Sequence, residues 1–447
     1  MMKLQILYKW ILVLVGGLVL SGCVDDELWE KAIVGDKEVW ANLSFGCPNQ
    51  ELVTITTRAT YELQYESVVR NLYVFIFANN ERVYGHYFDA EDKLSTQNAV
   101  QTATEEKWWV QNMTSSDGER TKGTIRMKVP VISNNAEVYV IANLDLNFLN
   151  ISEERLNMVR NKQELAEVVV SLNQQIVERN AGLFMMVGHK TGVSIADNGT
   201  ITVPGNKIEL HRIDAKVELN VKIDPNGSVS NDGQVYKVKE FVPDSWQVIN
   251  LPVNCSLIEG TVDPELEKRG EGYFNLPARK FETFSEEKGD GFSFYMLENR
   301  ENGKKSTNGN YHLRDKRLKN ADGTYNMGNG LWEYAPEFAT YVILKGTLNM
   351  LVNPNETGEQ QLTADVTYHI HLGDFATSTD NYNIERNTHY TYTITIKGVN
   401  NIEAEVVTSN DDLAGIQEDQ PGASGQLYKA GEEPFVFDAH YGNGCIH

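Results

Sequence analysis

Short apolar runs that alternate with polar residues, bounded by Gly, Asn, Asp and Pro, recur along most of this chain. Residues 390–396 read YTYTITI, in which tyrosine and isoleucine alternate with threonine, as expected of a half-buried strand. Because successive side chains of a strand point to opposite faces, this period of two indicates sheets with one buried face. Strands do not alternate with helices, so the sequence predicts a mainly β fold rather than a doubly wound α/β enzyme. The clearest predicted strands are Leu72–Phe77, Ile125–Val131, Glu137–Ala142, Lys216–Ile223, Gly291–Leu297, Thr340–Leu344, Ala364–His371 and Tyr390–Ile396.

One segment departs from the strand pattern and predicts a helix. Ser152 stands before Glu153 and Glu154, which is the arrangement of a helix N-cap with acidic residues in the first turn. Apolar residues then recur at roughly helical spacing, which predicts one amphipathic helix over residues 152–179 of the N-terminal domain. The residues of this apolar stripe are Leu156, Val159, Leu165, Val168, Val169, Leu172 and Ile176.

The 447 residues are enough for two or three domains of ordinary size. A stretch rich in turn-forming residues, Asp197–Lys207, precedes a fresh set of strands that begins at Ile208. We therefore predict an N-terminal β-sandwich that ends at residue 205 and a C-terminal β-sandwich over residues 206–400. Residues 401–447 are expected to form an acidic extension, in which a short apolar pattern returns near the end.

The N-terminus has the pattern of an export signal. Two lysines precede an apolar run, Ile11–Leu20, which is too short for a membrane-spanning helix of about 20 residues. Leu20-Ser21-Gly22-Cys23 follows, and this sequence has the form of a lipobox. The pattern predicts a signal peptide over residues 1–22 and lipidation of Cys23, which would hold the protein to a membrane through acyl chains. The alternative is an ordinary cleaved signal peptide followed by an incidental cysteine.

The charge and the cysteine spacing exclude some classes of partner and site. Lys and Arg number 40 and Asp and Glu 62, which gives a net charge of −22. Such an acidic protein repels nucleic acid, so nucleic acid is not an expected partner. The other cysteines, Cys47, Cys255 and Cys445, show no C-x-x-C spacing, so neither a zinc site nor a disulfide framework is supported. One long-range disulfide among them stays open.

Two local patterns could carry chemistry, and each also has a plainer interpretation. His369 and His371 lie two apart on a predicted strand and share one face, where they could bind a metal; we favour an exposed sheet face. Trp108 and Trp109 could form a platform for stacking sugars; we favour a buried aromatic pair. Hydrolase, metalloprotease and nucleotide-binding motifs do not occur in a fitting context, so the sequence predicts no catalytic residue, no cofactor and no metal site.

Several stretches together resemble the fimbrillins of the type V pilus, a polymer that Gram-negative anaerobes build from lipoprotein precursors. Their order and spacing cover nearly the whole mature chain, which is more specific than any one motif. They are the lipobox at Cys23, Thr57-Arg58-Ala59, Asn71–Phe77, Val138–Leu144, Met185–Gly188, Leu210–Leu219 and Asn383–Gly398. Phe294–Asn299 also resembles a subgroup of large fimbrillin-like proteins. The extension past Gly398 departs from a plain shaft subunit and leaves a tip, shaft or anchor position open.

The resemblance implies a fold of two tandem transthyretin-like β-sandwiches and a mode of assembly. In this family an N-terminal strand completes its own sheet until an arginine-specific protease cuts behind it, and a neighbour's C-terminal strand then takes its place. Residues 23–58 would be the propeptide here, and cleavage would separate Arg58 from Ala59, so the mature N-terminal β-sandwich would span residues 59–205. The inward-facing residues of the removable strand would be Val39, Ala41, Leu43 and Phe45.

Two alternatives concern this cleavage. The strand could be permanent, in which case Arg58 is an ordinary surface arginine. Arg70 is a second candidate for cleavage, but it lies beside the predicted strand Leu72–Phe77, so a cut there should damage the core. A donor strand of this chain's own would lie within residues 426–447, where apolar residues partly alternate.

From the resemblance we expect a pilus subunit that is not an enzyme, exposed at the cell outer membrane and incorporated into the fimbrium. The expected partners are other copies of the chain or related pilus subunits, the maturation protease, the outer membrane through the lipid anchor before maturation, and a host or bacterial surface ligand. The alternative is a monomeric surface lipoprotein that binds a glycan or a host protein, with Trp108 and Trp109 as its platform. A hydrolase is a third alternative.

Overall fold

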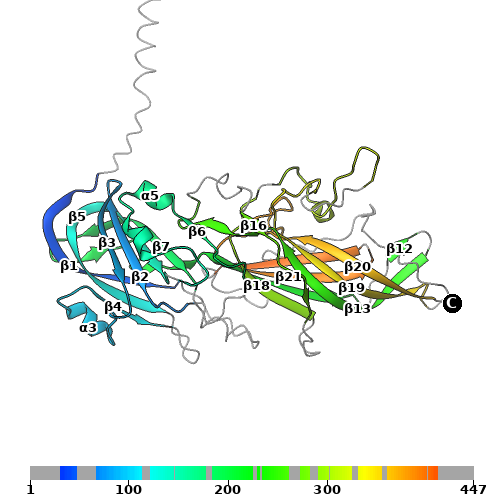
Figure 1. Cartoon of the computed structure of the whole chain (residues 1–447), viewed down its shortest axis with the longest axis horizontal. Coiled ribbons are helices and arrows are strands. Elements are labelled where there is room, and N and C mark those ends of the chain that lie inside the picture. The colour runs from blue at the N-terminus through cyan, green and yellow to red at the C-terminus, as the bar shows by residue number, and fades with distance from the viewer. Residues whose placement is uncertain are drawn as a thin grey trace, which may run out of the picture.

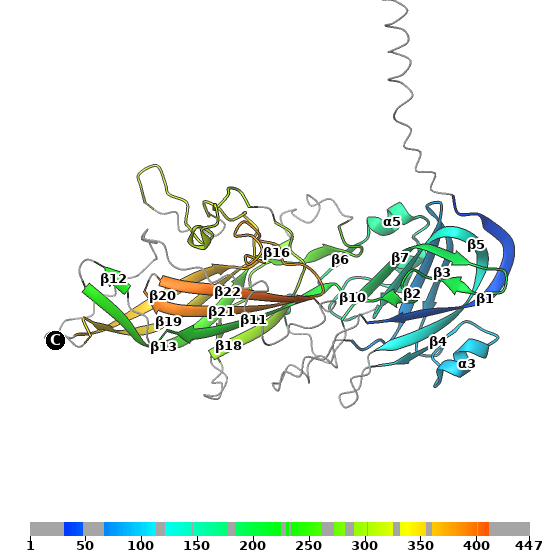
Figure 2. The same ribbon diagram turned by 180° about the vertical axis from the view of Figure 1, so that it is seen from behind.

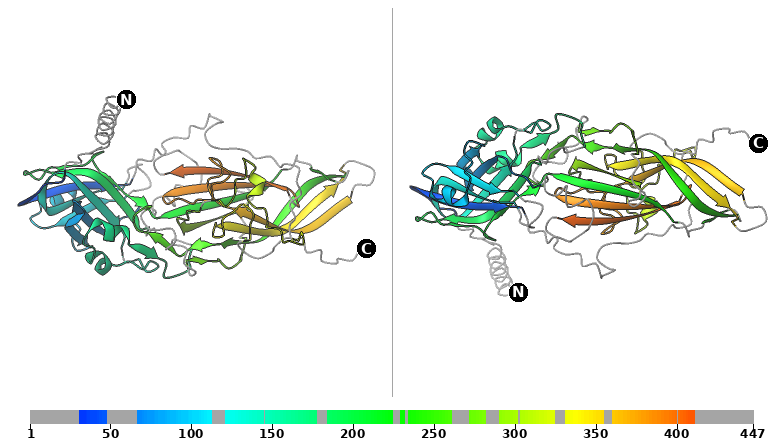
Figure 3. Two further views of the ribbon diagram at one scale, coloured as in Figure 1. Left: turned by 90° about the horizontal axis from the view of Figure 1, so that it is seen from above. Right: turned by 90° about the horizontal axis from the view of Figure 1, so that it is seen from below.

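In a computed structural model of the chain, β-strands predominate, which confirms the predicted mainly β fold. The strands form an elongated molecule in which an N-terminal half and a C-terminal half follow one another along the long axis (Figure 1). The views from behind, from above and from below show the same order of the two halves (Figure 2; Figure 3). The structure describes residues 31–47, 67–112, 121–144, 146–177, 184–224, 229–231, 234–260, 272–281, 290–301, 303–324, 331–354, 360–399 and 401–410.

The N-terminal half is built around one long strand, β5, which bends and takes part in two layers. The first part of β5 pairs with β1 on one edge and β4 on the other, and its last part pairs with β2 and β7. The bend lies where the pairing with β7 shifts, next to Asn135, whose φ is 51°. The predicted strands Ile125–Val131 and Glu137–Ala142 are therefore two parts of one strand. The strands of this half are β1 (Val34–Gly46), β2 (Leu72–Ala78), β3 (Glu81–Phe88), β4 (Lys107–Gln111), β5 (Lys122–Ala142), β7 (Met186–Ile195), β8 (Ile201–Thr202), β9 (Ile208–Glu209) and β10 (His211–Arg212).

Strand β2 is buried on both faces, as its unbroken apolar sequence LYVFIFA requires. Leu72, Val74 and Ile76 face the core that β2 shares with β1, β5 and β7. Tyr73 and Phe75 face the opposite way, into a second core beneath two short helices. This strand therefore joins the sandwich to the layer that covers it.

The single helix predicted over residues 152–179 is wrong. The segment forms two short helices, α4 (Glu153–Asn157) and α5 (Lys162–Ala166), followed by strand β6 (Val169–Ser171). Between the helices, the Arg160 carbonyl accepts a hydrogen bond from the Arg82 N–H, and the Lys162 N–H donates to the Asn80 carbonyl, so the β2–β3 turn binds the backbone here. Strand β6 pairs with β15 (Asn254–Ser256), which suits its β-branched residues better than a helix does. A third helix, α3 (Gln97–Thr102), precedes β4.

The C-terminal half has two sheets that enclose a common core. One has the order β18-β11-β21-β22, and the other the order β12-β13-β19-β20, with β17 beside β13. Both contribute apolar side chains to one large cluster, among them Leu219, Trp246, Leu348 and Tyr392. The strands are β11 (Asp214–Ile223), β12 (Val229–Asn231), β13 (Gln234–Ile249), β14 (Leu251–Pro252), β16 (Tyr273–Phe274), β17 (Arg279–Lys280), β18 (Asp290–Leu297), β19 (Tyr341–Val352), β20 (Gln360–His371), β21 (Thr388–Gly398) and β22 (Asn401–Asn410).

The residues at which the two halves begin and end differ from the predicted boundaries. Strands β9 and β10 lie after residue 205 but pair with β1 and β7, so the N-terminal sheet extends past the predicted boundary. Strand β22 lies after residue 400 but pairs along the length of β21, so the start of the predicted extension belongs to a sheet. At the junction, Arg386 donates hydrogen bonds to the carbonyls of Ser256 and Leu257 and to the carboxylate of Glu298.

Candidate functional site

The predicted removable strand is present as β1. Its side chains alternate, and the four that were expected to face inward are buried: Val39 is 8% exposed, Ala41 0%, Leu43 0% and Phe45 1%. They pack in one cluster with residues of β2, β4, β5 and β7. The strand begins at Val34, five residues earlier than the alternation predicted, because Gly35, Asp36 and Lys37 interrupt the apolar pattern without ending the strand.

Strand β1 is paired unequally on its two edges. It is antiparallel to β5, with paired residues at Val34 and from Glu38 to Gly46. On the other edge, the pairs found among the described residues are those of Phe45 and Gly46 with the two-residue strand β9. Along most of its length β1 is thus held by one neighbouring strand and by its buried side chains.

Near the C-terminal end of β1, Phe45 packs against a glycine of β5. A Cβ atom added to Gly123 of β5 would lie 2.1 Å from the Phe45 ring, closer than real Cβ contacts come. Phe45 and Gly123 are directly paired across the two strands, so the aromatic ring lies over the bare backbone. The sequence pattern identified Phe45 as inward-facing, but nothing local marked Gly123 as its partner.

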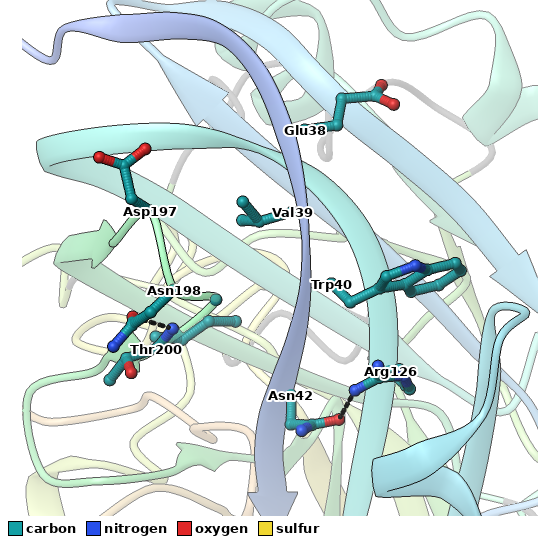
Figure 4. Close-up of a pocket in the computed structure, with 10 residues that line it drawn as sticks. Glu38, Val39, Trp40, Asn42, Arg126, Asp197, Asn198 and Thr200 are labelled. Atoms are coloured by element: carbon teal, nitrogen blue, oxygen red, sulfur yellow. Dashed lines mark hydrogen bonds between the residues drawn. The ribbon is translucent and has the colours of Figure 1, made fainter.

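The other edge of β1 faces the turn between β7 and β8. The two border an open groove of about 700 Å³, lined by polar groups of Glu38, Asn42 and Asp197 among others. In Figure 4, β1 runs between this turn, which carries Asp197, Asn198 and Thr200, and the Arg126 side of β5. Strand β1 therefore lies in a slot between β5 on one side and this turn on the other, and the open groove runs beside it.

Polar and aromatic side chains hold the outer face of β1 to β5. The guanidinium of Arg126 lies 5.2 Å from the Trp40 ring centre and donates from Nη1 to Asn42 Oδ1 at 3.3 Å. Its Nε donates to the Ala103 carbonyl at 2.6 Å. Burial lowers the pKa of Arg126. Lys128 and Glu38 form an ion pair at 3.1 Å that is exposed to solvent.

Most of the predicted modification sites lie outside the described residues. These are the lipidation site Cys23, the cleavage residues Arg58 and Ala59, and the tail from residue 426. Arg70 is described: its side chain is exposed, and its N–H donates to Asn143 Oδ1 at 2.9 Å. That hydrogen bond joins the main chain at Arg70 to the residue that follows β5.

His369 and His371 share a face of β20, but that face is covered, so the predicted exposed sheet face is wrong. His371 is fully buried; its Nδ1 lies 2.6 Å from Asp315 Oδ1, and the Trp332 ring packs edge-on against it. His369 accepts from Arg317 at 2.9 Å. Burial lowers the pKa of His371, and it lowers that of His369 to about 3. The covering residues lie far away in sequence, in the connection between β18 and β19, where no local pattern announces them.

The two tryptophans point in opposite directions from β4. Trp108 is fully buried, and its indole N–H donates to the Asp89 carbonyl at 2.6 Å. Trp109 is half-buried on the other face. The favoured interpretation of a buried pair therefore holds for Trp108 alone, and the two rings do not form a joint platform.

Within the ranges that the structure describes, no group of three or more His, Cys, Asp or Glu side chains is placed to hold a metal ion. In the same part of the chain, no helix has the length and apolarity needed to cross a membrane. Cys47 and Cys255 do not form a disulfide with one another, and Cys445 lies outside the described residues.

Comparison with known families gives two matches. Residues 43–238 match the family described as major fimbrial subunit protein (FimA). Residues 294–394 match a domain of unknown function, DUF4906. The first match begins within β1 and extends into the first strands of the C-terminal half. No curated protein matches the chain in sequence.

Three solved structures are similar to this chain at low sequence identity. A candidate cell adhesion protein from Parabacteroides distasonis is 16% identical, with a TM-score of 0.51; the match covers 84% of this chain and 100% of that one. The tip fimbrial protein Mfa3 from Porphyromonas gingivalis is also 16% identical, with a TM-score of 0.44 and the same coverage. A fimbrillin (FimA) from Porphyromonas gingivalis is 14% identical, with a TM-score of 0.37, over 80% of this chain and 90% of that one. The family match confirms the resemblance drawn from the sequence.

Proposed function

We propose that the chain is a fimbrillin-like structural subunit of a cell-surface pilus rather than an enzyme. The observation that carries the proposal is β1, the first strand of the sheet, which is held on one edge and is followed by Cys47 and then by the stretch that contains Arg58. A strand placed in this way can be removed by one cut. Two tandem transthyretin-like sandwiches, as in the family that the sequence resembles, form the rest of the subunit.

The precursor is a lipoprotein of the outer membrane in this proposal. The lipobox supplies Cys23 as the acylated residue, and Ala32, only nine positions later, is already buried in the fold. Several acyl chains on one cysteine give stable attachment without a membrane-spanning helix. The folded precursor is thus held close to the membrane until it is cut.

Cleavage between Arg58 and Ala59 then releases β1. The four buried side chains of β1 include Leu43 and Phe45, and fully burying one such large apolar side chain is worth about 1.5–3 kcal/mol. The vacated slot therefore binds a replacement strand with alternating apolar residues, supplied by a second copy or a related subunit. Residues 426–447 are the candidate donor of this chain. The polymer is the fimbrium, and adhesion to host or bacterial surfaces is its role.

The test is the polymer formed by cells that express Arg58→Ala. We expect this variant to reach the surface as intact precursor and to form no heat-resistant ladder on electrophoresis. Arg58→Lys keeps the charge but removes the arginine, so it should behave in the same way. Arg70→Ala is the matched control and should polymerise like the wild type. Mass spectrometry of wild-type fibres should find Ala59 at the N-terminus; fibres of ordinary length from Arg58→Ala would rule out this cleavage.

A further inference from the structure

At Gly199, the turn between β7 and β8 comes close to the backbone of β1. A Cβ atom added to Gly199 would lie 2.0 Å from the carbonyl oxygen of Trp40 and 3.1 Å from its carbonyl carbon. Gly199 also has a φ of 81°, a conformation that L side chains rarely adopt. Glycine is thus required here both by the turn and by the close approach of a second backbone.

The turn is a stiff structure fixed to the core. The Ala196 N–H donates to the Thr200 carbonyl at 2.9 Å, and the Gly199 N–H donates to the Ala196 carbonyl at 2.9 Å. The side chain of Asn198 accepts from the Thr200 N–H at 3.0 Å. On either side of the turn, Ile195 is fully buried and Ile201 packs against the same core as β1. The turn is therefore placed by the sandwich itself.

The contact falls on the edge of β1 whose neighbour among the described strands is the short strand β9. The Gly46 carbonyl points to this edge, because it accepts from the Leu210 N–H at 2.9 Å. Carbonyls two residues apart on a strand point the same way, which places those of Trp40 and Asn42 on this edge as well. Gly199 meets the first of them.

We propose that the turn Ala196–Thr200 is a latch that closes the slot over whichever strand lies beside β5, by contact with that strand's main chain. The occupant is β1 in the precursor and, since this inference rests on the proposed strand exchange, a strand from a second copy or related subunit in the polymer. Every strand presents carbonyls at the same spacing, so a contact of this kind does not depend on side chains. The latch must open for β1 to leave and closes again on its replacement.

Two glycines allow a matched test. Gly205 has a φ of 79°, close to that of Gly199, but a Cβ atom added there would have nothing within 4 Å. Gly205→Ala therefore imposes the same backbone strain without touching β1. Gly199→Ala adds the collision with Trp40 and should push the latch off the strand.

The measurement is hydrogen exchange by mass spectrometry on the full-length, uncleaved precursor. In Gly199→Ala, the amides of β1 should exchange at least tenfold faster than in Gly205→Ala, while those of β19 should be unchanged and report that the protein is folded. Ile201→Ala weakens the anchor of the turn without a collision and should give a smaller increase in the same amides. Equal β1 exchange in Gly199→Ala and Gly205→Ala overturns the latch, as does an unchanged rate in Ile201→Ala.

This experiment is separate from the test of cleavage. It uses precursor that has not been cut, so it tests the contact between the latch and β1 whether or not the pilus proposal holds. If the hydrogen exchange of the β1 amides responds as expected but cleaved protein keeps β1 in place, the latch is supported and the proposed replacement of β1 by another strand is refuted. If fibres form normally but the hydrogen exchange of the β1 amides does not respond, the replacement of β1 by another strand is supported and the latch is refuted.

Discussion

The first strand of the N-terminal half and the first long strand of the C-terminal half occupy very different positions. Among the described strands, β1 has one long neighbour, β5, and pairs with β9 only through Phe45 and Gly46. Strand β11 has two full neighbours: it is antiparallel to β18 and parallel to β21, with eight paired residues on each side. A strand with a partner on both edges cannot leave without breaking two ladders. The proposed strand exchange would therefore involve the N-terminal half, where β1 is paired along one edge, rather than β11.

Both halves nevertheless use the same packing device. Phe45 lies over Gly123 in the N-terminal half, and Phe241 lies over Gly346 in the C-terminal half, where an added Cβ would come within 2.5 Å of the ring. Aromatic rings over cross-strand glycines shield the backbone and fix the register of the pair. In the C-terminal half both partners are permanent, whereas Phe45 would leave with β1. The N-terminal half thus has a ring-sized space that a replacement strand must fill.

The largest expected effect is a loss of stability when a buried leucine of β1 or of β11 is shortened to alanine. Leu219→Ala in β11 and Leu43→Ala in β1 each remove a fully buried side chain, and such changes cost about 2–5 kcal/mol of the free energy of unfolding. Leu219→Ala should lower the guanidinium midpoint of both precursor and polymer. Leu43→Ala should lower that of the precursor alone, because residue 43 is absent after cleavage. Ser44→Ala, an exposed neighbour, is the control, and a polymer weakened by Leu43→Ala would show that β1 stays.

How much of this was visible in the sequence differs between the strands. The alternation of Val39, Ala41, Leu43 and Phe45 predicted β1 and its inner face correctly, because a sheet with one buried face imposes that period directly. Gly199 could not be found in this way. Its role depends on a contact with Trp40, about 160 residues earlier, and a turn glycine looks the same in sequence whether or not another backbone passes beside it.

The errors have the same origin. The apolar spacing of residues 152–179 fits a helix, but the β2–β3 turn and strand β15 bind this backbone and divide it. His369 and His371 were placed on one face correctly, but the spacing says nothing of what covers that face. In both cases a distant segment decides the outcome. Local periodicity gives the direction of a side chain, and only tertiary contacts give its environment.

A smaller expected effect is a difference between the two halves in how their stability depends on pH. Burial holds the pKa of His369 at about 3, below its ordinary value of 6.5, so below pH 6.5 the unfolded chain gains a proton that the folded chain does not. Stability of the C-terminal half should therefore fall by about 1–2 kcal/mol between pH 7 and pH 5. In the N-terminal half, a hydrogen bond from His189, together with Lys162, lowers the pKa of Glu137 from 4.5 to about 2. That contribution persists above pH 4.5 and is lost only as the pH falls toward 2.

The measurement is the guanidinium midpoint of the wild type and of His369→Gln at pH 7 and pH 5. Glutamine can still accept the hydrogen bond from Arg317 but does not titrate, so His369→Gln should lose less stability between the two pH values. His371 is also buried with a lowered pKa, so part of the pH dependence should remain. Glu137→Gln should leave the difference between pH 7 and pH 5 as it is in the wild type. An unaltered pH dependence in His369→Gln would contradict the assignment to this side chain.

The smallest expected effect tests whether the slot recognises the side chains of β1 or its backbone. Lys37 is the residue of β1 whose charge reaches the latch: its ammonium lies 3.7 Å from Asp197 Oδ1 and donates to the Asp197 carbonyl at 3.3 Å. Both side chains are more than half exposed, and ion pairs of this kind contribute about 0.5 kcal/mol or less, because solvent screens the charges and the side chains lose freedom. We therefore expect Lys37→Ala to leave β1 exchange and the guanidinium midpoint unchanged within error, in low and in high salt. A loss of more than about 1 kcal/mol that salt reduces would mean that the latch selects β1 by charge, since that exceeds what an exposed pair provides. A replacement strand would then need a cation at the same position, and the slot would discriminate between donors instead of accepting any strand of suitable apolar pattern.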